Sequence, residues 1–218
     1  MYLTCLQIIK IPEARLLLDI IQAKEPLSFN GIGLPKLIEL ARFHNIIPLI
    51  FHRLKSLSES IPQETYSYLR SVYLANLSNN LKLWNEFLKI NSAFRQEGIL
   101  ILPLKGMDML TRYYPEFDLR SLVDIDLLIK EEQFAQAENI LSQLGYRKEL
   151  FGLREEYWRR YQCHIAFYKE RTLVEVHWGL DFKRPGRIVL PQLWDRAIQV
   201  EAGKQKKMSG KGSSKATY

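Results

Sequence analysis

Cysteine is scarce in this sequence, and long apolar runs are missing from it. Cys5 and Cys163 are the only two cysteines among 218 residues; they are far apart and fit no metal-ligand spacing, so we expect reduced thiols. No segment approaches the roughly 18 uninterrupted apolar residues of a membrane helix. The N-terminus lacks a basic start followed by an apolar run and a cleavage site. We therefore expect no export signal, no membrane partner and a cytoplasmic protein.

Positive charge is concentrated at the C-terminus. The net charge is +7, of which residues 201–218 carry +4 through five lysines and one glutamate. The remainder is close to neutral, so it shows no basic footprint of a nucleic-acid-binding surface. Residues 203–218 also lack hydrophobic periodicity, which predicts a disordered basic tail. An RNA-binding protein that uses this tail is the least supported interpretation.

Helical periodicity dominates residues 1–95, which we expect to form a helical N-terminal region. One helix is predicted over 34–57, with Pro35 near its start. A longer helix is predicted over 65–97, and Gly98 would end it. The apolar stripes expected on the two helices are Leu37, Leu40, Ala41, Ile47, Leu49 and Ile50 on the first, and Tyr73, Leu77, Leu81, Trp84, Leu88 and Phe94 on the second.

The period changes after Gly98, and residues 96–202 are expected to form a core that is mostly β. Short apolar runs predict an interior strand over 99–104, a strand at about 123–129, and a hairpin of strands 164–169 and 172–178. Short helices are predicted at 107–114 and 131–145. Helices first and a β core second predict an α+β fold rather than an alternating βαβ array.

Two acids interrupt the apolar strand at 123–129. Because residues two apart in a strand point to the same side, Asp124 and Asp126 share one face, and Val123, Ile125 and Leu127 fill the other. Paired carboxylates repel, so a positive group should lie between them, and Mg²⁺ prefers such oxygen ligands. A bare Asp-x-Asp is more often an edge strand whose solvent face carries two acids.

Two further features favour the metal site. Glu175 and His177 share one face of the last predicted strand, and Glu175 would complete a cage of three carboxylates if this strand neighbours the aspartate strand. Alone, it would be a solvated strand residue. The Leu-Lys-Gly turn at 104–106 would let backbone N–H groups approach a phosphate, although turns also use glycine for purely conformational reasons.

Taken together, these motifs resemble the bacterial family called uncharacterised nucleotidyltransferase. That family belongs to the superfamily of DNA polymerase β and the small MNT proteins. The resemblance covers about residues 35–200 and implies a polymerase β-like mixed sheet flanked by helices. The matching motifs are Leu104-Lys105-Gly106, Tyr114-Pro115, Arg120 through Leu128, Leu144-Gly145-Tyr146 and Glu175-Val176-His177-Trp178.

The resemblance also implies a reaction and the residues for it. The enzyme would move a nucleoside monophosphate from an NTP to a hydroxyl acceptor (a small molecule, peptide, protein or RNA) and release pyrophosphate. The implied residues are Asp124, Asp126 and Glu175 as catalytic ligands of Mg²⁺ (or Mn²⁺), with Glu175 helping to activate the hydroxyl; Gly106, Lys105 and Arg120 toward phosphate; His164 or His177 toward the nucleotide; and Trp178 in packing.

Blander interpretations stay open. Lys105 and Arg120 are equally explained as surface charges, and His164 and His177 as histidines hydrogen-bonded beside a strand. The fold could also serve as an interaction or antitoxin-type partner with little turnover. Three ionised groups that face one point favour chemistry, because a pure scaffold has no need for them.

Overall fold

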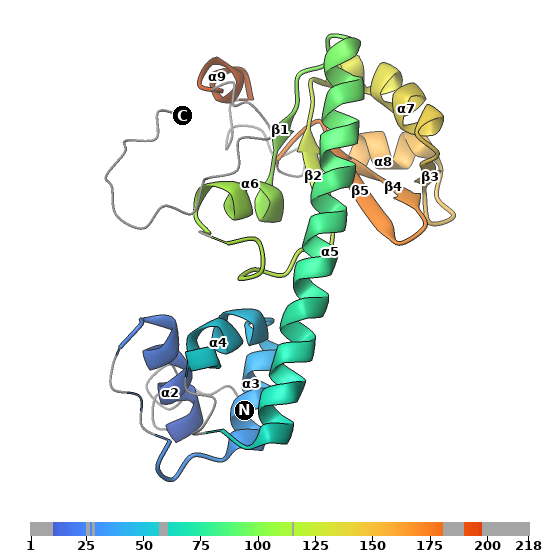
Figure 1. Cartoon of the computed structure of the whole chain (residues 1–218). Helices are drawn as coiled ribbons and strands as arrows, with labels where there is room; N and C mark the ends of the chain where they lie inside the picture. The colour runs from blue at the N-terminus through green and yellow to red at the C-terminus, as the bar shows by residue number, and fades with distance from the viewer. Residues whose placement is uncertain are drawn as a thin grey trace. The chain divides into compact units, whose positions relative to one another are not determined.

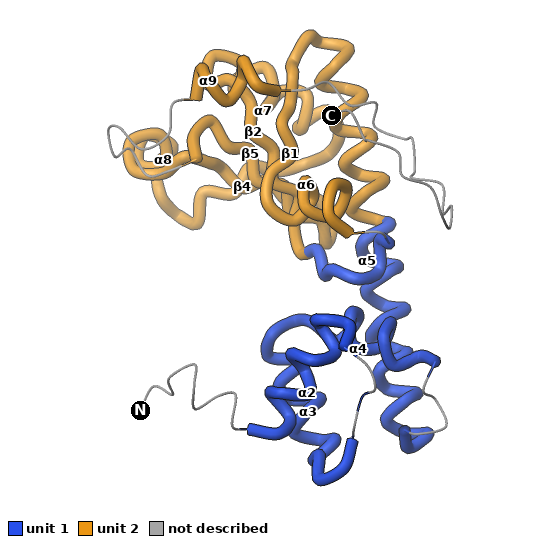
Figure 2. Tube along the Cα trace, turned by 90° about the vertical axis from the view of Figure 1, so that its left-hand side faces the viewer, with its two compact units in different colours: residues 1–81, 116–122 blue, residues 82–115, 123–218 orange. Residues whose placement is uncertain are grey.

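The structure is a computed structural model that describes residues 11–24, 27, 29–56, 61–114, 116–180 and 190–197. The chain divides into two compact units, residues 1–81 with 116–122 and residues 82–115 with 123–218 (Figure 2). Helix α5 (Gln63–Gln96) contributes to both units. Within the described residues, no helix has both the length and the apolar character needed to cross a bilayer. The predicted tail lies outside the described residues.

The first unit consists of short helices packed around the N-terminal part of α5 (Figure 1). Each short helix has a proline in its first turn, where the missing N–H needs no partner. These helices are α2 (Pro12–Ile21), α3 (Leu34–Phe43) and α4 (Ile47–Leu54). They share one apolar core, formed by Leu16, Leu17, Ile20, Leu37, Ala41, Ile47, Ile50, Phe51, Leu54, Ile61 and Leu69.

The single helix predicted over 34–57 is wrong, because α3 and α4 are separate helices. The chain turns between them at Asn45, whose φ of 54° is left-handed. The N–H of Ile46 closes this turn on the carbonyl of Ala41 at 2.9 Å. Asparagine tolerates this conformation better than most residues, and Pro48 then suits the first turn of a new helix.

The long helix is confirmed, but its predicted stripe is only partly correct. Gly98 ends α5 with a φ of 73°, and the N–H of Ile99 bonds the carbonyl of Phe94 at 2.9 Å. Leu81, predicted to be buried, is 42% exposed. Because α5 packs against elements of both units, its buried side chains follow a different register and include one polar residue. The buried residues are Leu69, Asn80, Leu83, Phe87, Ile90 and Phe94.

The second unit contains a five-stranded mixed sheet within the described residues, in the order β1-β2-β5-β4-β3. Strands β2 and β5 are parallel, and the other neighbouring pairs are antiparallel. This confirms the α+β class. The strands are β1 (Leu102–Pro103), β2 (Ile125–Leu128), β3 (Arg147–Glu149), β4 (His164–Lys169) and β5 (Thr172–His177). The predicted hairpin is confirmed, with Glu170 at a φ of 53° in its turn.

Two predicted strands are shorter than expected. The 99–104 run forms β1, a two-residue edge strand and not an interior one, and Leu100 is 60% exposed. Pro103 explains this, since proline cannot donate to a ladder and is confined to sheet edges. Strand β2 begins only at Ile125, and Val123 is 74% exposed instead of filling the apolar face.

Helices lie beside the sheet, as Figure 1 shows for α7 and α8 near β3 and β4. Phe134 anchors α7 through an edge-to-face contact with Trp178, whose ring centroid is 5.1 Å away. Trp178 is buried, as expected for a packing residue.

The described helices of this unit, besides α5, are α6 (Lys105–Arg112), the 3₁₀ turn η2 (Glu131–Gln133), α7 (Phe134–Gln143), α8 (Glu155–Tyr161) and α9 (Leu190–Asp195). Strand β3, α8 and α9 were not predicted.

Candidate active site

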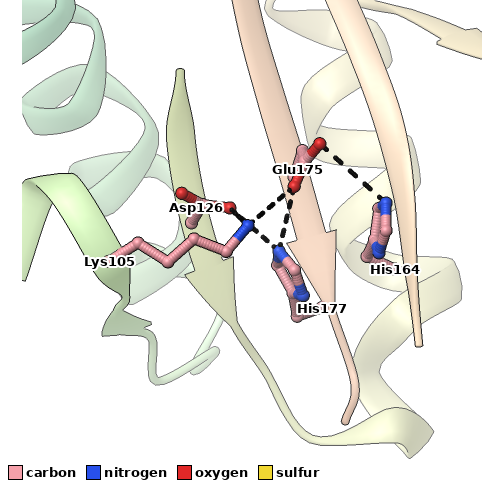
Figure 3. Close-up of polar contacts among 5 residues, drawn as sticks. All are labelled: Lys105, Asp126, His164, Glu175 and His177. Carbon is pink, nitrogen blue, oxygen red and sulfur yellow. Dashed lines mark hydrogen bonds and ion pairs between the residues drawn. The ribbon is translucent and has the colours of Figure 1, made fainter. Parts of the chain in front are cut away.

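Strands β2 and β5 bring two carboxylates side by side. They run parallel, and their register places Asp126 directly opposite Glu175 (Figure 3). Asp126 is 1% exposed. The sequence analysis predicted that Glu175 would join the aspartates on the condition that the two strands are adjacent. The structure meets it, and the two acids therefore face one point.

His177 joins these two acids from the same strand as Glu175. Its Nε2 lies 3.0 Å from Asp126 Oδ1 and 3.3 Å from Glu175 Oε2. Because both neighbours accept, Nε2 carries the hydrogen. Burial acts to lower the pKa of His177, but the hydrogen bonds to Asp126 and then Glu175 outweigh it and raise the pKa. We call Asp126, Glu175 and His177 the sheet cluster; its ligand atoms all lie within 4.8 Å of one another.

Lys105 places its ammonium between the carboxylates of the sheet cluster. Its Nζ lies 2.5 Å from Asp126 Oδ1 and 3.2 Å from Glu175 Oε2 (Figure 3). Burial acts to lower the pKa of Lys105, but the hydrogen bonds to the two acids outweigh burial, and the net shift is upward. The ammonium therefore stays charged. The Lys105 backbone has a φ of 45°, a costly left-handed conformation for a long side chain. Such local strain is typical of residues held in place at a site.

Asp124 lies just before β2 and is half-buried, outside the donor group of the sheet cluster. Burial, followed by the charges of Asp126 and Glu175, raises its pKa. The pKa of Glu175 moves the opposite way, because the hydrogen bond from His177 lowers it more than burial raises it. The pKa values of Asp124 and Glu175 are thus pushed apart: Glu175 is the ionised carboxylate, and Asp124 takes up a proton more readily.

The site carries a net negative charge when Asp124 is ionised. Asp124, Asp126 and Glu175 are opposed by Lys105 and, when it is protonated, by His177. When all five are ionised, one negative charge remains. Buried acids need compensation, so a further cation would be attracted here. The Lys105 ammonium already shows that the gap between Asp126 and Glu175 accepts a positive group.

His164 extends the site along the neighbouring strand β4. Its Nε2 is 3.9 Å from Glu175 Oε1, and its ring lies 4.8 Å from that of His177. Burial lowers the pKa of His164, which favours the neutral imidazole. Cys163, His164 and His177 form a second group of metal-ligating atoms. Sequence spacing missed it, because His164 and His177 are cross-strand partners that only the β4–β5 register brings together.

Helix α6 presents its N-terminus at this side of the sheet. Leu104 is its N-cap residue, with no side-chain capping bond, and the Leu104 N–H bonds the carbonyl of Asp126 at 2.9 Å. Gly106 is buried in the first turn. The left-handed residue of the turn is Lys105 and not the glycine. First-turn N–H groups of a helix have no partner within the helix and suit an anion.

Arg120 does not belong to the unit that holds the sheet cluster. It lies in the loop 116–122 of the first unit, where its carbonyl accepts a hydrogen bond from Asn80. Its Nε is buried and has no hydrogen-bond partner among the described residues. The structure therefore brings Lys105, Gly106, Asp126, Glu175 and His177 together, whereas Arg120 is assigned to the other unit.

A known protein family matches most of the chain. A family described as an uncharacterised nucleotidyltransferase matches residues 30–209. No curated protein and no solved structure matches. Because the matched region covers well over half of the sequence, the chain belongs to this uncharacterised nucleotidyltransferase family.

Proposed function

Starting from membership of this family, we propose that the protein moves a nucleoside monophosphate from an NTP to a hydroxyl acceptor with Mg²⁺ (or Mn²⁺) and releases pyrophosphate. One observation carries the proposal: Asp126 and Glu175 face each other across parallel strands, beside the N-terminus of α6. Carboxylate oxygens are the ligands that these cations prefer. The Lys105 ammonium between the two acids supports the fit, since it marks a position where positive charge is stabilised.

Asp124, Asp126 and Glu175 would hold the cation, whose charge polarises the phosphate and offsets the negative charge that develops during transfer. In the transfer, the acceptor oxygen bonds the α-phosphorus, the bond from that phosphorus to the bridging oxygen breaks, and pyrophosphate leaves. The proton of the acceptor hydroxyl would pass to solvent water. Glu175, with its lowered pKa, is ionised and can accept a hydrogen bond from the hydroxyl.

Lys105 would change partners when the substrate binds. In the structure its ammonium neutralises Asp126 and Glu175, and its side chain is 57% exposed, so it has room to move. A nearby phosphate would attract it once a cation compensates the two acids. Gly106, at the start of α6, would offer a backbone N–H to the same phosphates.

His177 and Arg120 have separate proposed roles. His177 would position Asp126 and Glu175 through the bonds of its Nε2 and would border the nucleotide. Such partners orient metal ligands. For Arg120, phosphate binding remains only a prediction from the family resemblance, because the residue belongs to the first unit.

The test is a screen of the four NTPs with Mg²⁺ or Mn²⁺ that follows pyrophosphate release against a panel of hydroxyl acceptors. We expect turnover with at least one combination, and none in Asp126→Asn. The control is Asp195→Asn, an exposed acid on α9 of the same unit. Equal turnover in wild type and Asp126→Asn would overturn the site. Metal binding without turnover in any combination would favour the interaction-partner alternative.

A further inference from the structure

A third cluster of metal-ligating side chains lies in the first unit and has no part in the proposed reaction. His52 from α4 meets Glu116 and Asp118 from the loop 116–122, and their ligand atoms lie within 4.8 Å of one another. We call these three residues the loop cluster. His52 Nδ1 is 3.4 Å from Glu116 Oε2. Residues more than 60 positions apart are brought to one point here.

Asp118 provides the evidence that the loop cluster binds a ligand. It is 7% exposed, and its Oδ2 accepts a hydrogen bond from the hydroxyl of Tyr73. Its other oxygen, Oδ1, is buried without a hydrogen-bond partner in the part of the chain that is described. Leaving a buried acceptor unpaired is costly, above all on a charged group. A cation at the loop cluster would satisfy this oxygen.

Tyr73 and the loop backbone hold Asp118 in position. Burial and then the hydrogen bond to Asp118 raise the pKa of Tyr73, so its phenol keeps the proton that it donates. Asn76 donates to the carbonyl of Asp118 at 2.8 Å, and Asn80 donates to the carbonyl of Phe117. Partners that orient a ligating carboxylate in this way are a regular feature of metal sites.

The donor set selects the kind of cation. One imidazole and two carboxylates suit a borderline divalent ion such as Zn²⁺, with water in the remaining position, better than Mg²⁺, which prefers oxygen alone. The side chains of His52 and Glu116 are 20% and 30% exposed, so water and ions can reach them. Lys55 Nζ lies 3.3 Å from His52 Nδ1 and is itself exposed, so it can leave when the cation arrives.

We propose that His52, Glu116 and Asp118 bind a divalent transition-metal ion of the Zn²⁺ class, which fastens the loop 116–122 to α4. This inference does not rest on the proposed nucleotidyl transfer. It concerns different residues in a different unit. A protein inactive toward every NTP could still carry this site.

Zn²⁺ binding to the full chain tests the proposal, by isothermal titration together with the melting temperature. Because the sheet cluster and the group of Cys163, His164 and His177 also offer ligands, the titrations are made in an Asp126→Asn, His164→Ala, His177→Ala background. We expect one remaining equivalent of Zn²⁺ and a rise in melting temperature on binding. Both should disappear in His52→Ala and in Asp118→Asn. The matched control is His44→Ala, an exposed histidine of the same unit outside the cluster, which should still bind.

Asp118→Asn separates a metal site from a purely structural carboxylate. It keeps the shape of the side chain and removes its charge, so the metal-free protein should melt at the same or a higher temperature while Zn²⁺ no longer stabilises it. Unchanged Zn²⁺ stoichiometry and affinity in both His52→Ala and Asp118→Asn would overturn the proposal. So would a background protein that binds no Zn²⁺. If Asp118→Asn fails to fold, His52→Ala alone decides.

Discussion

The two clusters use the same kinds of side chain in opposite electrostatic situations. In the sheet cluster, Asp126 is neutralised from within by Lys105 and His177. In the loop cluster, Asp118 accepts a hydrogen bond from Tyr73, and its other, buried oxygen has no partner among the residues that the structure describes. The presence of carboxylates and histidines does not by itself make a metal site. The affinity for a metal cation also depends on whether a positively charged side chain of the protein already neutralises the carboxylates.

Helix α5 shows the same contrast between the two units. In the first unit it holds the loop 116–122 through neutral asparagine amides, above all Asn80. In the second it uses an ionised acid, since Glu86 bonds Tyr146, Lys89 and Lys169. We therefore expect protonation of Glu86 to weaken these polar contacts in the second unit, whereas the asparagine contacts in the first unit do not titrate.

The largest expected effect concerns the chemistry of the sheet cluster. Glu175→Gln should lower NTP turnover by at least about a thousandfold, because it removes about 4 kcal/mol of charge stabilisation and the group that accepts from the hydroxyl. Pyrophosphate release under saturating NTP measures it, with Asp195→Asn as the control that keeps wild-type turnover. A loss of less than tenfold in Glu175→Gln would mean that Glu175 is a positioning residue only.

The next effect concerns the anchor of the loop cluster. Asn80 is fully buried, donates to the carbonyls of Phe117 and Arg120, and accepts from the N–H of Leu122. Asn80→Ala leaves these buried groups unpaired and should lower the free energy of unfolding by about 3 kcal/mol. Denaturant titration measures it.

Asn79→Ala is the matched control for the Asn80 anchor. The Asn79 side chain is exposed and, within the described part of the chain, donates one hydrogen bond, to the carbonyl of Leu122. Its replacement should cost no more than about 1 kcal/mol of unfolding free energy. Equal losses in Asn79→Ala and Asn80→Ala would show that the loop does not depend on the buried amide.

Lys105→Met would make the sheet cluster resemble the loop cluster. With the internal ammonium gone, Asp126 and Glu175 lack their neutralising partner, so Mg²⁺ should bind the NTP-free protein about tenfold more tightly, while turnover falls. A tenfold gain corresponds to about 1.4 kcal/mol. Calorimetric titration with Mg²⁺ measures it, with Lys130→Met as the exposed-lysine control. Weaker Mg²⁺ binding would show that Lys105 does not compete with the cation.

The smallest effect separates the two halves of α5 by pH. Burial acts to raise the pKa of Glu86, but the bonds from Lys89 and Tyr146 lower it below the ordinary carboxyl value. A lowered pKa gives stability that is present above the ordinary carboxyl range and lost as pH falls through the lowered value. Glu86→Gln should therefore cost about 1 kcal/mol of unfolding free energy at pH 7 and nothing in strong acid.

The cost of Asn80→Ala provides the contrast for this pH series, because an amide does not titrate. Denaturant titrations of both variants across the acid range measure the two costs together. The loss in Asn80→Ala should stay constant for as long as the protein is folded. A pH-independent loss in Glu86→Gln would show that its hydrogen bonds, and not its charge, matter.

The sequence determined those features that depend on neighbours along the chain. Period and end signals located α5, α7 and the β4–β5 hairpin, because side-chain spacing and glycine conformations are local. The motif order indicated the family, and the two acidic strands indicated Asp126 and Glu175 as site residues. The break at Asn45 was missed because helical periodicity continues across a turn that Asn45 and Pro48 allow, and the exposure of Val123 was missed because β2 begins only at Ile125.

Only the tertiary structure decided which of these residues meet. The parallel pairing of β2 with β5 sets Asp126 against Glu175, and the packing of α6 against β2 brings the Lys105 ammonium between them. Likewise, His52 and Asp118 are neighbours in the folded unit, where Tyr73, Asn76 and Asn80 hold the loop of Asp118 on α5. The physical reason is the same in each case: contacts between residues far apart in the chain depend on the packing of whole elements, which no local pattern encodes.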